Sequence, residues 1–125
     1  MDISGIYCSG PDASNGGSDT PLKVTIKHNF IHSAAETDDS AGIWLKYRNR
    51  YGEIAYNFIS SYRMGIAYYN GGPITGDVSI YHNTIDLDTS FGNADRNTTM
   101  GISLYGTSEN CGSITIRDNI FNRAT

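Results

Sequence analysis

An eight-residue phrase that occurs four times limits the folds open to this chain more than any other feature of its sequence. In each copy an Asn follows an Ile by three positions and precedes an Ile or Phe by two, and the copies are Val24–Ile31, Gly52–Ile59, Val78–Ile85 and Ile114–Phe121. Apolar residues at alternate positions lie on one face of a strand. The phrase therefore predicts a short strand with one buried side.

A second phrase, centred on Gly-Ile, alternates with the first, and its copies are Ser4–Cys8, Ala41–Leu45, Met64–Tyr68 and Met100–Leu104. Alternation along a strand predicts that its first, third and fifth positions face the core. The inward rows are then Ser4, Ala41, Met64 and Met100; Ile6, Ile43, Ile66 and Ile102; and Cys8, Leu45, Tyr68 and Leu104. The outward files are Tyr7, Trp44, Ala67 and Ser103, and beside them Ser9, Lys46, Tyr69 and Tyr105.

The spacing between copies indicates how the phrases are arranged in space. Each copy carries an Asn at the same position, and successive Asn residues are 28, 26 and 36 residues apart in the sequence. They are Asn29, Asn57, Asn83 and Asn119. Hairpins would need two-residue turns of the Asn-Gly type, whereas variable segments separate these strands. Repeats of this length favour a solenoid in which like phrases stack in parallel. We expect loops at 9–22, 33–40 and 86–99, and a much shorter connection at 60–63.

The alternation of V-x-I-x-x-N-x-I with G-I-x-L resembles the repeat of right-handed parallel β-helix proteins of the pectate-lyase-like superfamily, from Ile3 to Phe121. It implies an all-β fold, a right-handed parallel β-helix (solenoid) of about four to five short coils. Residues 1–125 would form a single β-helix domain, either a minimal β-helix or a fragment of a longer one.

The same resemblance implies a class of chemistry and a location. The superfamily includes polysaccharide lyases, glycoside hydrolases, uronate epimerases, phage tailspikes and proteins without known activity, so the fold alone does not imply one reaction. It also implies an extracellular or cell-surface protein, although the sequence does not begin with a signal peptide.

The charge and hydropathy of the chain argue against several classes of partner. The net charge is −4 at pH 7, and nucleic acids or anionic membranes would require a basic surface. No apolar run reaches the roughly 18 residues of a membrane span. Cys8 and Cys111 should lie about three repeats, or roughly 14 Å, apart, which excludes a disulfide within one chain. We expect Cys8 to be a small core residue.

The row of Asn residues is the most regular polar feature, and its simplest explanation is structural. Asn tolerates a tight turn, and stacked amides can hydrogen-bond along the row. The residues before each Asn should stack in the same way, and they are His28, Tyr56, His82 and Asp118. The two His would be about 10 Å apart, too far to share one zinc ion. They are either solvated turn residues or include one His that acts as an acid or base on a ligand.

The outward files of the Gly-Ile strands provide the candidate ligand-binding residues, which are Tyr7, Trp44, Lys46, Arg48, Tyr69 and Tyr105. Aromatic rings spaced one repeat apart suit sugar rings, and the cations suit carboxylates or hydroxyls. The alternative is that strands simply favour aromatic residues. We predict that this sheet binds or processes an acidic or neutral polysaccharide. A non-catalytic structural or interaction module is the second hypothesis.

Acidic residues near the loop at 86–99 offer oxygen ligands for calcium, and the candidates are Asp86, Asp88 and Asp95. The competing explanation is a solvated acidic loop, and the sequence requires no cofactor. If the chain is an enzyme, a Lys base would suit a polysaccharide lyase and a carboxylate pair would suit a glycoside hydrolase. No residue matches a family motif closely enough to be assigned as catalytic.

The two ends of the repeat array favour self-association. Both terminal phrases read as ordinary repeats, with little sequence left to cover them. Uncovered terminal strands leave backbone groups and the Ile rows exposed. We therefore expect a homo-oligomer that forms through a terminal coil or through the aromatic face. The residues Phe30, Phe58 and Ile120, each at the outward position after an Asn, provide a second candidate contact surface.

Overall fold

The computed structural model describes residues 3–9, 23–32, 40–46, 51–70, 77–87, 100–106 and 113–123. The strands are β1 (Ile3–Ser9), β2 (Lys23–Lys27), β3 (Phe30–His32), β4 (Ser40–Lys46), β5 (Tyr51–Ala55), β6 (Phe58–Tyr62), β7 (Met64–Asn70), β8 (Val78–Tyr81), β9 (Thr84–Leu87), β10 (Met100–Gly106), β11 (Ile114–Arg117) and β12 (Ile120–Arg123). These ranges contain no helix, and hence none long and apolar enough to cross a membrane. The expected all-β class is confirmed.

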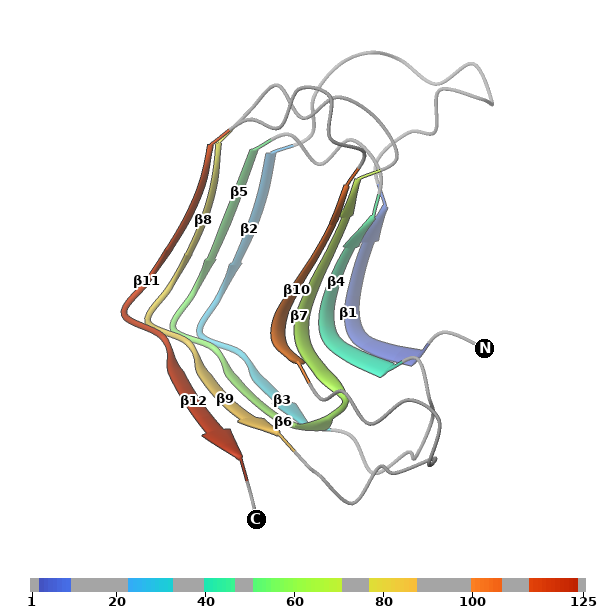
Figure 1. The fold of residues 1–125 in the computed structure, drawn as a ribbon, viewed down its shortest axis with the longest axis vertical. Helices are drawn as coiled ribbons and strands as arrows, with labels where there is room; N and C mark the ends of the chain where they lie inside the picture. Colours follow the sequence, from blue (N-terminus) through green and yellow to red (C-terminus); the bar gives the residue numbers. More distant parts are fainter. Residues whose placement is uncertain are drawn as a thin grey trace.

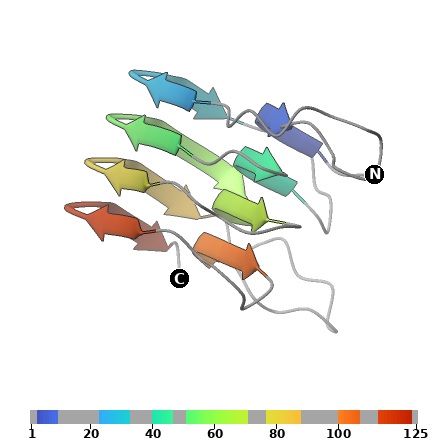
Figure 2. The same cartoon turned by 90° about the horizontal axis from the view of Figure 1, so that it is seen from above.

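The strands form three parallel sheets of four strands each (Figure 1). Sheet A has the order β1-β4-β7-β10, sheet B the order β11-β8-β5-β2, and sheet C the order β12-β9-β6-β3. Every three consecutive strands thus give one strand to each sheet, and we number these sets repeats 1 to 4 (β1–β3, β4–β6, β7–β9 and β10–β12). Figure 2 shows the repeats stacked in chain order. Like phrases stack on like phrases, as predicted, because Ile26 pairs with Ile54 and Ile54 with Ile80.

The core lies between the sheets and consists of stacked aliphatic rows. In repeats 2 and 3 the inward Ile, Val and Leu side chains are 0–1% exposed except for Leu87, which is 6% exposed; the others are Ile43, Leu45, Ile54, Ile59, Ile66, Val78, Ile80 and Ile85. Cys8 packs against this core as a partly buried free thiol. Burial raises its pKa. The predicted core role of Cys8 is confirmed, while Cys111 lies outside the described residues.

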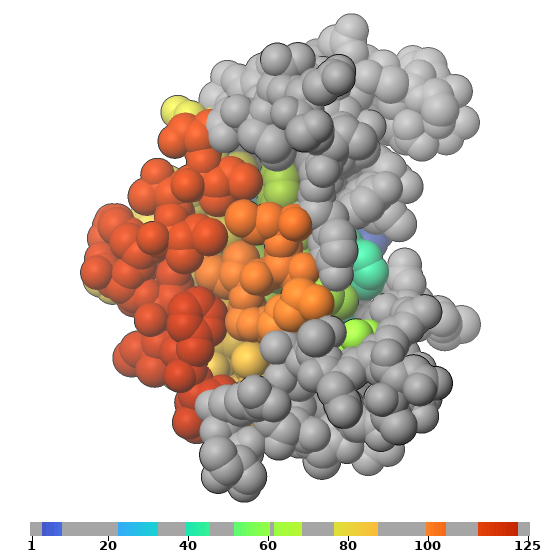
Figure 3. Space-filling view, viewed as in Figure 1, coloured from blue at the N-terminus to red at the C-terminus, as the bar shows by residue number. Residues whose placement is uncertain are grey.

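Burial differs between the two ends of the stack. In repeat 1, Ile26 and Ile31 are only 6% and 7% exposed. In repeat 4, the inward side chains of Leu104, Ile116 and Phe121 are 48%, 44% and 52% exposed. Figure 3 views the molecule onto repeat 4, with β10 in orange and β11 and β12 in red. The expected uncovered Ile row is found at the repeat 4 end. In repeat 1 the expectation is wrong for Ile26 and Ile31, which are buried, while Ile6, Cys8 and Val24 are partly buried.

Each strand of sheet A bends at its Gly, and the bend decides which residues face the core. A Cβ atom on Gly42 would lie 2.1 Å from Cγ2 of Ile59 and 2.8 Å from the carbonyl oxygen of Gly65. Gly42 therefore faces inward at a point where sheet C leaves no room for a side chain. Ile43 also faces the core. Two successive inward residues interrupt the alternation on which the sequence prediction rests.

The residues before the Gly consequently face away from the Ile core. Ala41 and Met64 are buried in a separate cluster with Ala67, and Met100 and Trp44 pack against it. Because Ala67 and Trp44 alternate with inward residues of β7 and β4, this cluster lies on the outer side of sheet A. Ser4, Ala41, Met64 and Met100 were predicted to face the core. The prediction is wrong for Ala41, Met64 and Met100, which face the outer side of sheet A.

The Asn phrase leads the chain from sheet B into sheet C through one residue in the left-handed conformation. The φ angles of His28, Tyr56, His82 and Asp118 are 57°, 56°, 53° and 54°. The left-handed residue is thus the one before the Asn, at a cost of roughly 1–2 kcal/mol for an L-residue. The Asn side chains offset this cost by hydrogen bonds along the row. Asn57 Nδ2 donates to Asn83 Oδ1 (2.9 Å) and to the carbonyl oxygen of Ile26 (3.0 Å). The predicted structural role of the Asn row is confirmed.

Candidate functional site

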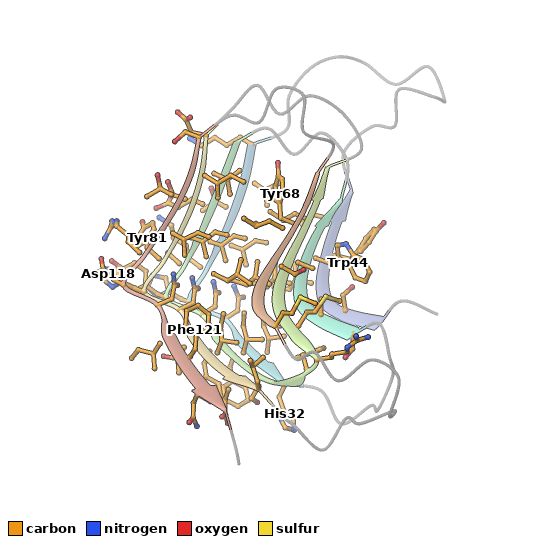
Figure 4. The ribbon with its side chains drawn as sticks, viewed as in Figure 1. His32, Trp44, Tyr68, Tyr81, Asp118 and Phe121 are labelled. Atoms are coloured by element: carbon orange, nitrogen blue, oxygen red, sulfur yellow. The ribbon has the colours of Figure 1, made fainter. Side chains whose placement is uncertain are left out.

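The candidate site begins on the outer side of sheet A, where the register pairs Tyr7 with Trp44, as predicted. Their ring centroids are 6.5 Å apart and the ring planes meet at 63°, an edge-to-face arrangement. Tyr7 is 48% exposed. Figure 4 shows Trp44 on the side of sheet A that faces away from the other sheets. The two rings form an aromatic corner at the repeat 1 end of the sheet.

Trp44 is anchored by the apolar cluster on this side of the sheet. It packs against the cluster of Ala41, Met64 and Ala67, and its indole Nε1 is buried. Farther along the same file, Ala67 and Ser103 are 0% and 4% exposed. The expectation of a solvent-facing row is therefore wrong for these two residues. Of the four residues in this file, only Tyr7 is largely exposed.

The neighbouring file is aligned as the sequence predicts. The backbones of Ser9, Lys46, Tyr69 and Tyr105 follow one another in register across the four strands of sheet A. Lys46 is thus two residues along the strand from Trp44, and Tyr69 lies on the adjacent strand. Arg48, the remaining candidate, lies outside the described residues. The backbone register therefore brings five of the six predicted binding residues onto one sheet.

A second aromatic surface lies at the turn between sheets B and C. The ring of Tyr56 is stacked between those of His28 and His82, with centroids 5.2 Å away on each side and interplanar angles of 5° and 23°. The predicted stacking is confirmed for these three residues. Both faces of the Tyr56 ring are covered, so Tyr56 presents its ring edges to solvent. Tyr7, which has one edge-to-face ring neighbour among the described residues, is not stacked in this way.

A charged cluster on the outer face of sheet B links all four repeats. Lys27 Nζ lies 2.7 Å from Glu53 Oε1, which also accepts a hydrogen bond from the Tyr81 hydroxyl. The hydrogen bond from Lys27, followed by that from Tyr81, lowers the pKa of Glu53. The hydrogen bond to Glu53 raises the pKa of Lys27 and of Tyr81. The guanidinium of Arg117 sits 4.5 Å from the centre of the Tyr81 ring.

Sequence reasoning missed this cluster, although its signal was present in the repeat. Lys27, Tyr81 and Arg117 all stand two positions before an Asn, so the alignment of the phrases already places them in one row. Glu53 comes from the row two positions earlier on the neighbouring strand. The two rows are connected because the side chains of Lys27 and Tyr81 are long enough to contact Glu53.

The acidic residues with described contacts are engaged within the fold. Besides Glu53, Asp118 pairs with Arg117 at 2.7 Å, and Asp86 Oδ1 accepts a hydrogen bond of 2.8 Å from Asn122. The part of the chain that the structure describes contains no group of three or more His, Cys, Asp or Glu able to hold a metal ion. Asp88 and Asp95 lie outside that part. Calcium binding therefore stays a prediction.

A Ser-His contact on the outer face of sheet C invites comparison with a nucleophile and its base. His32 Nδ1 lies 2.8 Å from Ser60 Oγ, and Asp86 is the next residue in the row. In a catalytic triad the carboxylate orients the imidazole from behind, whereas Asp86 stands on the far side of the Ser. Ser60 is also only 7% exposed. This contact is best explained as part of the polar row that stabilises sheet C.

The chain was compared with protein families, with curated proteins and with solved structures, and none of them matches it.

Proposed function

We propose that this protein is a right-handed parallel β-helix that binds a polysaccharide at the repeat 1 end of sheet A. Three observations support the architecture: all strand pairs are parallel, each repeat supplies one strand to each sheet, and the repeats stack in chain order. Connections between parallel strands of one sheet are right-handed in about 98% of cases. The superfamily that the repeat resembles uses this architecture.

The proposal is based mainly on the Tyr7–Trp44 pair. Sugar rings pack against the face of an aromatic ring, so a binding residue must keep a face uncovered. Tyr7 is half exposed and meets its one ring neighbour at 63°, while Trp44 is held in place by the cluster behind it. A rigid, partly exposed pair loses little conformational freedom when a ligand binds.

The neighbouring file provides the second part of the proposed site. Lys46 is the cation nearest to Trp44 in the register, and Tyr69 and Tyr105 continue the file across repeats 3 and 4. A cation near aromatic rings suits the carboxylate of a uronic acid. An acidic glycan bound at the Tyr7–Trp44 corner, with Lys46 beside it in the register, is the ligand this arrangement would favour. An extracellular or cell-surface location fits such a ligand.

Calorimetric titration with uronate oligomers and with neutral cello- and xylo-oligosaccharides tests this proposal. Tyr7→Ala should weaken binding about fivefold, because one stacking contact contributes roughly 1 kcal/mol. Tyr56→Ala is the matched control, since Tyr56 is also 48% exposed but has both ring faces covered. Its affinity should stay within about twofold of the wild type. Equal losses in both variants, or no binding to any glycan, would contradict the proposal.

The same titrations can separate binding from catalysis and from a metal requirement. Absorbance of unsaturated uronate products, recorded in parallel, reports lyase activity. Repetition with calcium and with a chelator reports whether the acidic residues near 86–99 take part. Trp44→Ala is less informative, because Trp44 packs against Ala41 and Met64 and its loss would also destabilise the fold.

A non-catalytic interaction module is the second candidate function, and one observation favours it. Phe30 and Ile120, on the outer face of sheet C, are 75% and 63% exposed. Large apolar side chains exposed in one row commonly mark a contact surface between macromolecules.

A further inference from the structure

A row of side chains on the outer face of sheet C has an exposed apolar residue at each end. Phe30, Phe58, Thr84 and Ile120 follow one another in register across the sheet. Phe30 stacks on Phe58 with a centroid distance of 5.2 Å and an interplanar angle of 2°. The first and last members of the row, Phe30 and Ile120, are the two most exposed large apolar residues that the structure describes.

The residues on either side of this row divide the face into two chemically different halves. Repeats 1 and 2 present aromatic rings and imidazoles, which belong to His28, Phe30, His32, Tyr56 and Phe58. Repeats 3 and 4 present two carboxylates, one imidazole and smaller side chains, which belong to Asp86, Asp118, His82, Thr84, Ile120 and Asn122. Both phenylalanine rings of this face thus lie in one half, and both carboxylates lie in the other.

We propose that two copies of this chain pack through the outer faces of sheet C, related by a two-fold axis that lies between the sheets and runs parallel to the strands. Such an axis places repeat 1 of one copy opposite repeat 4 of the other, and repeat 2 opposite repeat 3. Phe30 then meets Ile120 of the second copy, and His28 meets Asp118 of the second copy. The surface complements itself, as an isologous contact requires.

Both carboxylates of this face keep one oxygen for the contact. Asp118 uses Oδ2 for Arg117, which leaves Oδ1 to accept a hydrogen bond from the imidazole of the second copy's His28. Asp86 uses Oδ1 for Asn122, which leaves Oδ2 facing repeat 2 of the second copy. Each apolar and polar contact occurs twice across the axis.

Two other ways of joining two copies make different contacts. A two-fold axis along the stacking direction would place each repeat opposite itself, so that Asp118 would meet Asn122 and His82 would meet Asp86; rescue of His28→Asp by Asp118→His distinguishes the two axes. Head-to-tail stacking would need an open repeat 1 end, but Ile26 and Ile31 are already shielded at 6% and 7% exposure. Of these arrangements, the proposed axis is the one that brings Phe30 opposite Ile120 and His28 opposite Asp118.

The size of the face sets the expected affinity. At ~4.8 Å per strand and ~3.3 Å per residue, the four strands and their adjoining turn residues cover roughly 300 Å² in each copy. A standard interface buries about 800 Å² per partner. The dimer should therefore be weak, with a Kd in the range of about 10 to 1000 μM.

Sedimentation equilibrium of the full chain over about 10 μM to 1 mM tests this inference. The wild type should fit a monomer–dimer equilibrium, and Phe30→Ser should raise the Kd at least about tenfold because it removes two symmetric contacts. His28→Asp should also weaken the dimer, since two carboxylates would then face each other. The double variant His28→Asp/Asp118→His should restore it. Asp and His both tolerate the left-handed conformation at these positions.

Control variants separate this face from the other exposed surfaces. Phe121→Ser changes the open end of repeat 4, and Tyr7→Ala changes the proposed glycan site on sheet A; both should leave the dimer intact. A monomer at every concentration, open-ended assembly, loss of the dimer in Phe121→Ser, or no rescue by the double variant would each overturn the inference. Thermal melts of each variant identify any that do not fold. Glycan binding by Tyr7 is measured separately, so the two proposals can fail independently.

Discussion

Replacing Asn57 by Ala should destabilise the fold far more than the same change at Asn29, although both residues occupy the same place in the repeat. Asn57 is 2% exposed and takes part in four side-chain hydrogen bonds. Its Nδ2 donates to Ile26 and Asn83, and its Oδ1 accepts from the backbone amide and from the Nδ2 of Asn29. Asn57→Ala removes all four bonds.

The magnitude follows from that count. Each hydrogen bond contributes about 1 kcal/mol net, and buried groups left without a partner add a penalty of roughly 1–3 kcal/mol. The carbonyl oxygen of Ile26 and the amide of Asn29 would lose their partner in the Asn57 side chain. We therefore expect the free energy of unfolding to fall by about 4 kcal/mol or more. For a chain of this size such a loss is a large share of the total stability.

Asn29 provides the comparison because it begins the row. Its Nδ2 donates to the carbonyl oxygen of Lys27 and to Asn57 Oδ1, both at 2.9 Å. No described group donates to its Oδ1, and the residue is only partly buried. Asn29→Ala should lower the free energy of unfolding by about 1–2 kcal/mol.

Urea titrations followed by circular dichroism give both values. If the two variants lose equal stability, or if Asn57→Ala loses less than about 1 kcal/mol, the Asn row does not stabilise the turns in the way described here. An unchanged m value would show that the loss comes from the native state and not from a change in the surface exposed on unfolding.

Two further changes test the packing and the charges. Gly42→Ala should destabilise the protein by roughly 1–3 kcal/mol because its Cβ would lie 2.1 Å from Ile59. Gly52→Ala should be tolerated, because its Cβ would lie 3.5 Å from Val78. Thermal melts that rank the two variants in the opposite order would contradict the bend at Gly42. The pKa of Glu53 is lowered from its ordinary value of 4.5, so its stabilising effect should be complete above pH 4.5 and be lost as the pH falls through the folded-state pKa. Acid unfolding curves should therefore be shallower for Glu53→Gln in this range, and identical curves would show that the Lys27–Glu53–Tyr81 cluster contributes no stability.

Much of the fold follows from the repeat. The spacing of Ile26 and Asn29 recurs in every copy, and this local pattern predicted the short strands, the inward Ile rows, the parallel stacking and the structural Asn row. It also predicted that Tyr7 and Trp44 would be neighbours, because residues at equal positions in successive copies pair across a sheet. Periodicity along the chain determines these features.

Other features depend on which atoms approach one another in space. The bend at Gly42 arises because Ile59, from sheet C, leaves no room for a side chain, and that bend turns Ala41 and Met64 away from the Ile core. The contacts of Glu53 come from Lys27 and Tyr81, 26 and 28 residues away in the chain. Neither contact can be read from the local pattern of one strand.

The sequence by itself determined the period, the register and the inward Ile rows, because alternation and repetition are properties of the chain. Only the tertiary structure decided which aromatic rings keep a free face, since ring stacking at Tyr56 and edge-to-face contact at Tyr7 depend on neighbours in other repeats. It also decided that Ile116 and Phe121 of repeat 4 are exposed while Ile26 and Ile31, at the equivalent positions of repeat 1, are buried. Exposure is a property of the surroundings of a residue and not of its place in the repeat.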